Sequence, residues 1–275
     1  MNDAADRPIG VFDSGVGGLT VVRELWRLLP EESVVYFGDT ARVPYGPKSP
    51  ATVRRYAREA AAFLLGRGVK MIVVACNTAT AHAIEVLYEE LPVPVVGVVD
   101  PGARAAARAT RSGRIGVIGT AGTIASGAYD RDLRRYLPEA RIFAQPCPLF
   151  VPLVEEGWGN HPATRLIAQE YLDPLARVDI DTLVLGCTHY PLLRPVLSEI
   201  LGDAITLVDS AEEAVFDARR ILEDRGLRRV GDDAPAHTFI VSDSPLRFRE
   251  TSRHFLGGRV EVVEEVDVEG YGRAA

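Results

Sequence analysis

The sequence predicts an α/β protein of two similar domains, each with a mostly parallel sheet flanked by helices, and an active site in the cleft between them. Short β-rich runs alternate with longer helical stretches along the 275 residues, which is typical of α/β folds. Most of the early runs, such as IVVA and LVLG, are continuously apolar, as in parallel strands covered on both faces. Two early segments also resemble two later ones, as one fold used twice would.

The apolar runs give the expected strands in chain order. They are Ile9–Phe12, Val34–Gly38, Met71–Ala75, Val95–Val98, Ile115–Ile118, Arg141–Ala144, Thr182–Gly186, Thr206–Val208, Thr238–Val241 and Val260–Val263. Longer segments between them predict helices. These are Leu19–Leu29, Ala51–Gly66, Thr78–Glu90, Thr164–Leu175 and Ala211–Glu223.

The internal repeat sets the expected domain division. GVFDSGVGGLTVV near the start resembles GVIGTAGTIAS at Gly116–Ser126, and IVVACNTATA resembles LVLGCTHYPL further on. Two similar domains bring similar strand ends to one cleft, and open parallel sheets bind ligands beyond the carboxyl ends of their strands. We expect a first domain at 1–99 plus 210–275 and a second at 100–209, with the crossover near Asp100-Pro101-Gly102.

Composition excludes several classes of protein. Hydrophobic residues make up 47% and charged residues 25%, which is globular composition. The net charge of −7 gives no general attraction to nucleic acid, and no apolar run approaches the length of a membrane span. Three widely spaced cysteines make no disulfide framework, and the first residues show no secretory signal, so we expect a cytoplasmic protein.

Cys76 and Cys187 are the strongest candidates for chemistry. Each directly follows an apolar strand and precedes an expected helix, where the helix dipole lowers a thiol pKa and makes thiolate available. The adjacent Asn77, Thr78 and Thr188 are good helix N-caps with hydrogen-bond donors for a carboxylate. Either cysteine alone is equally well explained as a buried apolar residue. Equivalent places in a repeat favour function.

Two loops could line the same site. Asp13-Ser14-Gly15-Val16-Gly17-Gly18 opens a helix, and its backbone amides suit a carboxylate. It lacks the pattern of a dinucleotide fingerprint, and a simple strand-to-helix turn capped by Asp13 is the alternative. Thr40–Gly46 is a rigid Pro- and Gly-containing loop whose amides near Tyr45 and Gly46 could face a ligand, or it is an ordinary loop.

Other residues are candidates for acid–base, metal or cofactor roles. His189, beside Cys187, could orient or protonate a group in the site. Glu155 alone is typical of a solvated charge, and Cys147 of a structural residue. No closely spaced Cys or His pairs predict zinc, and neither of the two lysines suits a pyridoxal Schiff base.

Five motifs, in this order and spacing, resemble the bacterial glutamate racemases of the aspartate/glutamate racemase superfamily. The motifs are FDSGVGGLTV, YFGDTARVPYG, VVACNTATA, CPLFVPLVEEG and GCTHYPLL. The resemblance covers about Pro8 to Phe255, and DSGVGG and ARVPYG narrow it to the glutamate branch.

The resemblance implies a cofactor-independent interconversion of L- and D-glutamate that supplies D-glutamate for peptidoglycan, by a protein that is typically a homodimer. It implies that Cys76 and Cys187 are the two bases, serving the D- and the L-enantiomer respectively. It also implies assisting acids or bases at Asp13, Glu155 and His189. The substrate contacts that it implies are Asp13, Ser14, Tyr45, Gly46, Asn77, Thr78, Thr123, Thr188 and His189.

Two alternatives stay open from the residues. The chain could be a related racemase acting on aspartate or a similar acid. It could also be a non-catalytic module that binds a carboxylate in the same cleft, although mere binding needs no thiols there.

Overall fold

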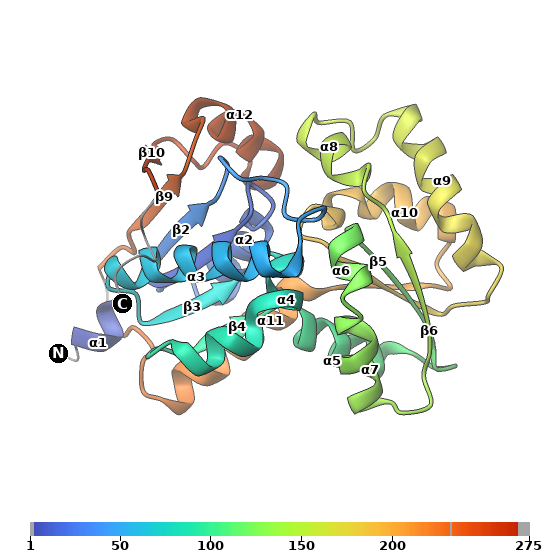
Figure 1. The fold of residues 1–275 in the computed structure, drawn as a ribbon, viewed down its shortest axis with the longest axis horizontal. Helices are drawn as coiled ribbons and strands as arrows, with labels where there is room; N and C mark the ends of the chain where they lie inside the picture. The colour runs from blue at the N-terminus through green and yellow to red at the C-terminus, as the bar shows by residue number, and fades with distance from the viewer. Residues whose placement is uncertain (1–2, 232, 269–275) are drawn as a thin grey trace.

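The computed structural model describes residues 3–231 and 233–268, and over these ranges the chain forms two parallel sheets with helices on both faces (Figure 1). The first sheet has six strands in the order β10-β9-β2-β1-β3-β4, and the second has four in the order β6-β5-β7-β8. Every strand pair in them is parallel. The predicted fold class is confirmed.

The first sheet comes from both ends of the described chain and the second from the middle. The strands of the first sheet are β1 (Ile9–Asp13), β2 (Val34–Gly38), β3 (Met71–Val74), β4 (Val95–Gly97), β9 (His237–Val241) and β10 (Glu264–Glu265). Those of the second are β5 (Arg114–Gly119), β6 (Arg141–Pro146), β7 (Thr182–Gly186) and β8 (Thr206–Asp209).

The helices fill the connections between strands. They are α1 (Asp3–Asp6), α2 (Leu19–Leu28), α3 (Pro50–Gly66), α4 (Asn77–Glu90), α5 (Val99–Ala109), α6 (Ala121–Ala125), α7 (Ala128–Tyr136), α8 (Phe150–Glu155), α9 (Pro162–Ala176), α10 (Arg194–Leu201), α11 (Ser210–Asp224), α12 (Pro245–Leu256) and the 3-10 helix η1 (Tyr190–Leu193). None of them, within the described ranges, combines the length and apolarity that crossing a bilayer requires.

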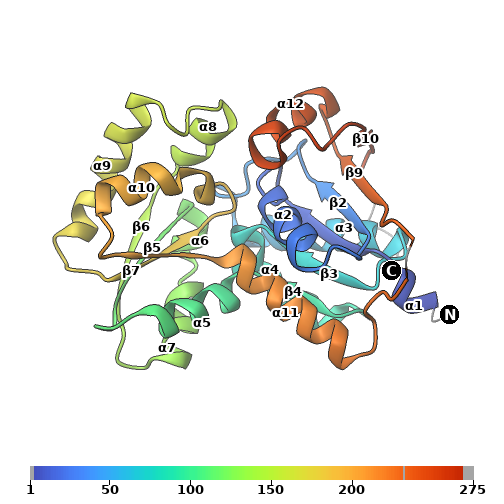
Figure 2. The same cartoon turned by 180° about the vertical axis from the view of Figure 1, so that it is seen from behind.

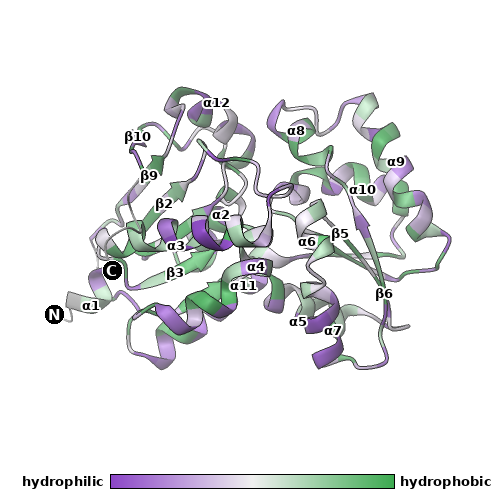
Figure 3. Cartoon of the chain, viewed as in Figure 1, coloured by the Kyte–Doolittle hydropathy of each residue, from purple (hydrophilic) through white to green (hydrophobic). Residues whose placement is uncertain are grey.

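The continuously apolar runs are buried parallel strands, as predicted. All residues of β1, β2, β3 and β7 are buried, whereas the edge strand β6 is partly exposed along its length. Figure 3 shows hydrophobic residues along the strands and hydrophilic ones on outward helices such as α7. The apolar runs are needed because helices cover both faces of each sheet.

The two sheets repeat one strand order. β1 lies between β2 and β3, and β5 lies between β6 and β7 in the same way. Cys76 follows β3 and Cys187 follows β7, so the cysteines stand at corresponding strand ends. This is the arrangement that the internal repeat in the sequence predicts.

One predicted strand is wrong. Val260–Val263 forms no strand, and the short β10 begins at Glu264, which pairs with Ile240. Val260 is buried and Val263 partly buried against the core, while Val262 stays exposed. The apolar residues therefore pack from an irregular segment after Gly257 and Gly258, whose positive φ angles of 63° and 88° end α12.

The crossover between sheets is a helix. Asp100, Pro101 and Gly102, where we expected the crossover, form the first turn of α5. Proline is tolerated there because the first amides of a helix have no partner within the helix.

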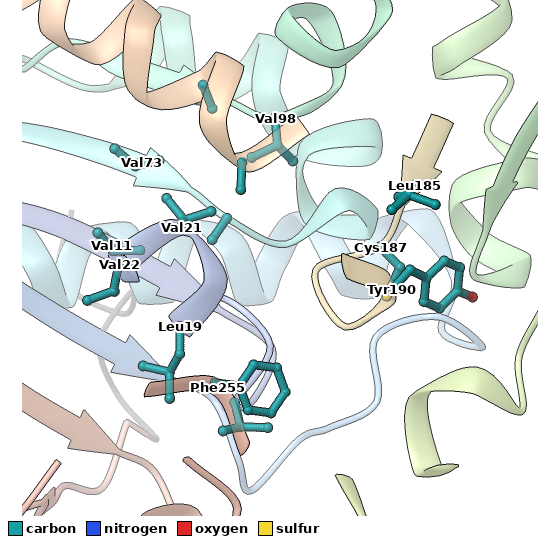
Figure 4. Close-up of a cluster of buried hydrophobic side chains, with 14 of the residues drawn as sticks. Val11, Leu19, Val21, Val22, Val73, Val98, Leu185, Cys187, Tyr190 and Phe255 are labelled. Atoms are coloured by element: carbon teal, nitrogen blue, oxygen red, sulfur yellow. The ribbon is translucent and has the colours of Figure 1, made fainter. Parts of the chain in front are cut away.

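A single hydrophobic cluster extends across both sheets. Its members include Val11 and Val73 of the first sheet and Leu185 and Tyr190 in and after β7 (Figure 4). The cysteine side of β7 is thus held against the first sheet by apolar packing, which positions the site described next.

Candidate active site

Both cysteines line one small cavity between the two sheets. In Figures 1 and 2 the sheets lie side by side, with α8 and α12 on opposite sides of the gap. The cavity has a volume of about 30 Å³, room for little more than water. It is lined by Ser14, Val43, Pro44, Tyr45, Gly46, Cys76, Asn77, Thr78, Thr120, Val151, Cys187, Thr188 and His189.

Cys76 caps the helix that follows it. Its sulfur accepts a hydrogen bond from the Ala79 amide at 3.4 Å and lies 3.7 Å from Ser14 Oγ. Burial, with a smaller contribution from the charge of Asp13, nevertheless raises the pKa of the Cys76 thiol to about 12. The expectation that the helix start would lower this pKa is wrong for Cys76, because desolvation outweighs the favourable helix terminus.

Cys187 sits in a different local structure. A turn and the 3-10 helix η1 follow it, and the next α-helix begins only at Arg194. Thr188 therefore does not cap an α-helix, and Asn77 follows the cap instead of forming it, since Cys76 takes that place. The predicted helix-dipole argument fails at Cys187 because no α-helix starts beside it.

A histidine and a carboxylate stand behind Cys187. His189 Nδ1 lies 3.8 Å from the Cys187 sulfur, and Nε2 lies 2.9 Å from Glu155 Oε1. Burial disfavours the imidazolium, but hydrogen bonds to Cys187 and Glu155 outweigh it and raise the pKa of His189 to about 10. A positively charged imidazolium therefore lies beside the Cys187 sulfur.

Glu155 acts on the site only through His189 in this structure. It lies at the end of α8 and lines a neighbouring cavity of about 270 Å³. The Phe255 ring packs edge-to-face against the His189 ring, with 5.6 Å between the ring centres, and restricts the orientation of the imidazole. The Cys187 sulfur, the His189 imidazole and the Glu155 carboxylate therefore contact one another in that order, starting at the cysteine cavity.

Asp13 and Asn77 each keep one buried polar atom without a partner among the described residues. Asp13 Oδ2 accepts the Gly15 amide at 2.9 Å, but Oδ1 has no partner. Burial raises the pKa of Asp13, opposed by the charge of His189. Asn77 Oδ1 accepts the Tyr129 hydroxyl at 2.7 Å, whereas Nδ2 has no partner. Asn77 lines the cavity, whereas Asp13 does not, so only the unpaired donor belongs to a residue of the cavity wall.

Threonines from both sheets meet at the cavity. Thr78 Oγ1 lies 2.9 Å from Thr120 Oγ1 and 3.1 Å from Thr123 Oγ1. Thr123 is buried behind this contact and does not line the cavity itself. Thr120 lines the cavity but was not predicted. The repeat contained the signal, because Thr120 follows β5 and Gly119 as Ser14 follows Asp13 at the end of β1.

Glycines allow the close approach of the two sheets. A Cβ on Gly122 would lie 2.6 Å from the Gly46 carbonyl oxygen, and one on Gly17 would lie 2.2 Å from Thr188 Oγ1. Both distances are shorter than the 3.0 Å below which a Cβ atom does not approach a non-bonded neighbour, so these close contacts favour glycine.

Lys70 and Cys147, which the sequence did not favour for chemistry, make structural contacts. Lys70 is buried and donates to Glu32 at 2.5 Å and to the Ala5 carbonyl at 2.6 Å. Cys147 is buried, with its sulfur 3.6 Å from the Gln145 carbonyl. Over the described part of the chain, no group of three or more His, Cys, Asp or Glu side chains is arranged to hold a metal ion.

Fold and site together define a class: a protein with a repeated α/β domain and a thiol from each repeat facing one small cavity. The family profile of the Asp/Glu/Hydantoin racemases matches residues 9–218. The chain belongs to this family, and to its glutamate racemase branch.

Known relatives are similar over nearly the whole chain. It is 52% identical over 263 residues to the glutamate racemase of Geobacter metallireducens, covering 96% of this chain and 97% of the relative. The solved glutamate racemase from Thermus thermophilus in complex with β-chloro-D-alanine is 49% identical, with coverage of 96% and 98% and a TM-score of 0.88. The one from Francisella tularensis in complex with D-glutamate is 38% identical, with coverage of 97% and 100% and a TM-score of 0.91.

Proposed function

We propose that Cys76 and Cys187 are the two bases that move the α-proton of glutamate, one on each face of the substrate. The protein is an amino-acid racemase that interconverts L- and D-glutamate. The observation that carries the two-base proposal is the placement of both thiols, from corresponding strand ends, on one cavity. Inversion by proton transfer needs a group on each face of the carbon, and this arrangement supplies them.

The reaction is a balanced exchange of one proton between two sulfurs. One thiolate removes the α-proton and becomes a thiol, while the electron pair delocalises into the substrate carboxylate. The opposite thiol then protonates the other face and becomes a thiolate. Following the family resemblance, Cys187 deprotonates L-glutamate and Cys76 deprotonates D-glutamate.

The electrostatics favour one starting state. The high pKa of Cys76 keeps its thiol protonated at neutral pH. The imidazolium of His189 lies beside the sulfur of Cys187. Cys76 thus starts as a proton donor, and we propose that Cys187 acts as the base toward L-glutamate.

The substrate is held by the polar groups around the sulfurs. Asn77 lines the cavity, and its buried, unpaired Nδ2 suits donation to a carboxylate. Asp13 does not line this small cavity, so its unpaired Oδ1 could accept from a substrate ammonium group only once the site has widened. The predicted contacts from Ser14, Tyr45, Gly46, Thr78, Thr188 and His189 all line the cavity, and Thr120 joins them. Because the cavity of about 30 Å³ is too small for glutamate, the site must widen when the substrate binds.

The test is incubation with L-glutamate in D₂O without added cofactor or metal, followed by NMR and optical rotation. We expect loss of the α-proton signal and appearance of D-glutamate. Cys76→Ala and Cys187→Ala should each abolish racemisation, while the matched variant Cys147→Ala, also at a buried cysteine, should retain it. Full activity in both site variants would exclude the two-base mechanism. Exchange on aspartate alone would favour the related racemase, and binding without exchange would favour the binding module.

We propose domains at 1–99 plus 210–275 and 100–209, supported by the separate origins of the two sheets. Three free cysteines suit the cytoplasm, where D-glutamate would supply peptidoglycan synthesis. The family resemblance supports a homodimer, which sedimentation of the purified protein would test.

A further inference from the structure

We propose that Asp39 is a positioning residue that holds the Tyr45–Gly46 wall of the cavity in place for glutamate, an inference that rests on the proposed function. Asp39 directly follows β2 and is fully buried. It does not line the cavity, so its carboxylate has no direct role in proton transfer. Its contacts are what assign it a role.

Both carboxylate oxygens of Asp39 are occupied by side-chain donors. Arg42 Nε donates to Oδ1 at 2.9 Å and to Oδ2 at 2.8 Å. The Tyr45 hydroxyl donates to Oδ2 at 2.5 Å, and the Ser242 hydroxyl donates to Oδ1 at 3.0 Å. Two of the three partners belong to the loop that forms the cavity wall.

That loop has little regular structure of its own. Residues 40–46 form no helix or strand, yet Tyr45 and Gly46 are buried and line the cavity. Asp39 holds the side chains of Arg42 and Tyr45 through hydrogen bonds to one buried carboxylate. The Arg42 guanidinium carbon also lies 4.1 Å from the centre of the Tyr56 ring. A buried charge that accepts from several donors is costly to disturb, so it fixes their positions.

The segment that follows β9 is hydrogen-bonded to the same loop. The Ser242 hydroxyl accepts the Ala41 amide at 2.9 Å while donating to Asp39. The Asp243 amide donates to Thr40 Oγ1 at 2.9 Å. These hydrogen bonds join the loop to Ser242 and Asp243, which follow β9. Asp39 therefore contacts Ser242 on one side and Tyr45 on the other.

The position of the loop matters for both halves of the site. A Cβ on Gly46 would lie 3.0 Å from the Thr120 Cβ, so Gly46 touches the second sheet directly. Displacement of Tyr45 and Gly46 would therefore move the cavity wall and alter the contact between Gly46 and Thr120. We expect this to weaken binding of both enantiomers, because the wall faces the substrate whichever sulfur acts.

The experiment compares Asp39→Asn with Glu90→Gln. Glu90 makes a similar two-pronged contact, with Arg58 at 2.6 and 2.8 Å, but on the exposed surface at the end of α4. The Asp39→Asn change keeps the shape of the side chain but turns one acceptor into a donor that meets other donors. We expect KM for both enantiomers to rise on the order of tenfold, with a smaller change in kcat, and no change in Glu90→Gln.

A second variant tests the route through Tyr45. Tyr45→Phe removes only the hydroxyl and leaves the Asp39–Arg42 pair, so it tests the idea even if Asp39→Asn does not fold. We expect its KM to rise in the same direction, and the double variant to be less affected than the product of the two single effects. Unchanged KM in Tyr45→Phe, or independent effects in the double variant, would overturn the proposal.

Deuterium uptake separates this proposal from the function it rests on. Uptake at the amides of residues 40–46 needs no substrate, and we expect it to be faster in Asp39→Asn than in the wild type or Glu90→Gln. Unchanged uptake would overturn the positioning role even if racemisation is intact. Faster uptake in a protein whose wild type does not exchange the α-proton would leave the loop role standing and remove the proposed function.

Discussion

Replacing Glu155 by glutamine should move the alkaline limit of catalysis downward. In the structure, hydrogen bonds to Cys187 and Glu155 overcome burial and raise the pKa of His189 to about 10. A raised histidine pKa means that the imidazolium persists below about pH 10 and is lost above it. The positive charge beside the Cys187 sulfur is thus present through neutral pH in the wild type.

The size of the shift follows from one hydrogen bond. A hydrogen bond to a charged group contributes about 1.5–3 kcal/mol, and one pKa unit corresponds to about 1.4 kcal/mol. Glu155→Gln should therefore lower the His189 pKa by about one to two units, nearer one because the Glu155 side chain is 25% exposed. With a shift of about one unit, the protonated fraction near pH 9.5 falls roughly threefold, and near pH 7 it hardly changes.

The assay is the pH dependence of kcat/KM for both enantiomers, followed by circular dichroism. Because L- and D-glutamate have the same free energy in water, kcat/KM must be equal in the two directions at every pH. The variant should lower both values equally above about pH 9, while kcat and KM separately change differently for each enantiomer. Glu156→Gln, which removes an exposed partner of Arg247, is the matched control. An alkaline limit that stays in place in Glu155→Gln would refute the role assigned to this hydrogen bond.

Other changes have equally specific expectations. Gly122→Ala places a Cβ against the Gly46 carbonyl, so we expect impaired closure and roughly a tenfold or greater loss of kcat/KM in steady-state assays with little change in the unfolding midpoint. Glu32→Gln leaves Lys70 buried without its carboxylate, and thermal unfolding should show a loss of about 3–5 kcal/mol with unchanged activity per folded molecule; unchanged stability would contradict this. Blocking thiols at neutral pH should modify Cys147 last, because burial raises its pKa well above that of an ordinary thiol, and mass spectrometry would detect the order.

The strands could be predicted because buried strands are recognisable from a short run of apolar residues. Runs such as Met71–Val74 and Thr182–Gly186 are apolar almost without interruption, since helices cover both faces of each sheet. Val260–Val263 misled the prediction because its valines pack against the core from an irregular segment. An apolar run predicts that a segment is buried. Whether the segment forms a β-strand depends on a neighbouring strand with which its backbone can hydrogen-bond.

The candidate site was predictable in part. The repeat alone places Cys76 and Cys187 at corresponding strand ends, and the motif residues around them line the cavity. The same repeat also contains Thr120, which the prediction missed. The contacts of Tyr129 with Asn77 and of Ser242 with Asp39 join residues distant in the sequence, and no local pattern signals them. Tyr45 is only six residues from Asp39, but their hydrogen bond depends on how the irregular loop between them folds.

The sequence by itself determined the two parallel sheets, the repeat that relates them and the pair of thiols at their strand ends, because these depend on short-range patterns of apolar and polar residues. The tertiary structure alone decided the surroundings of those thiols. Helix position favours thiolate at Cys76, yet burial beside Asp13 raises its pKa, while the sulfur of Cys187 lies beside a histidine that is hydrogen-bonded to Glu155. The physical reason is that desolvation and charge pairing depend on what covers a group, and that covering comes from distant parts of the chain.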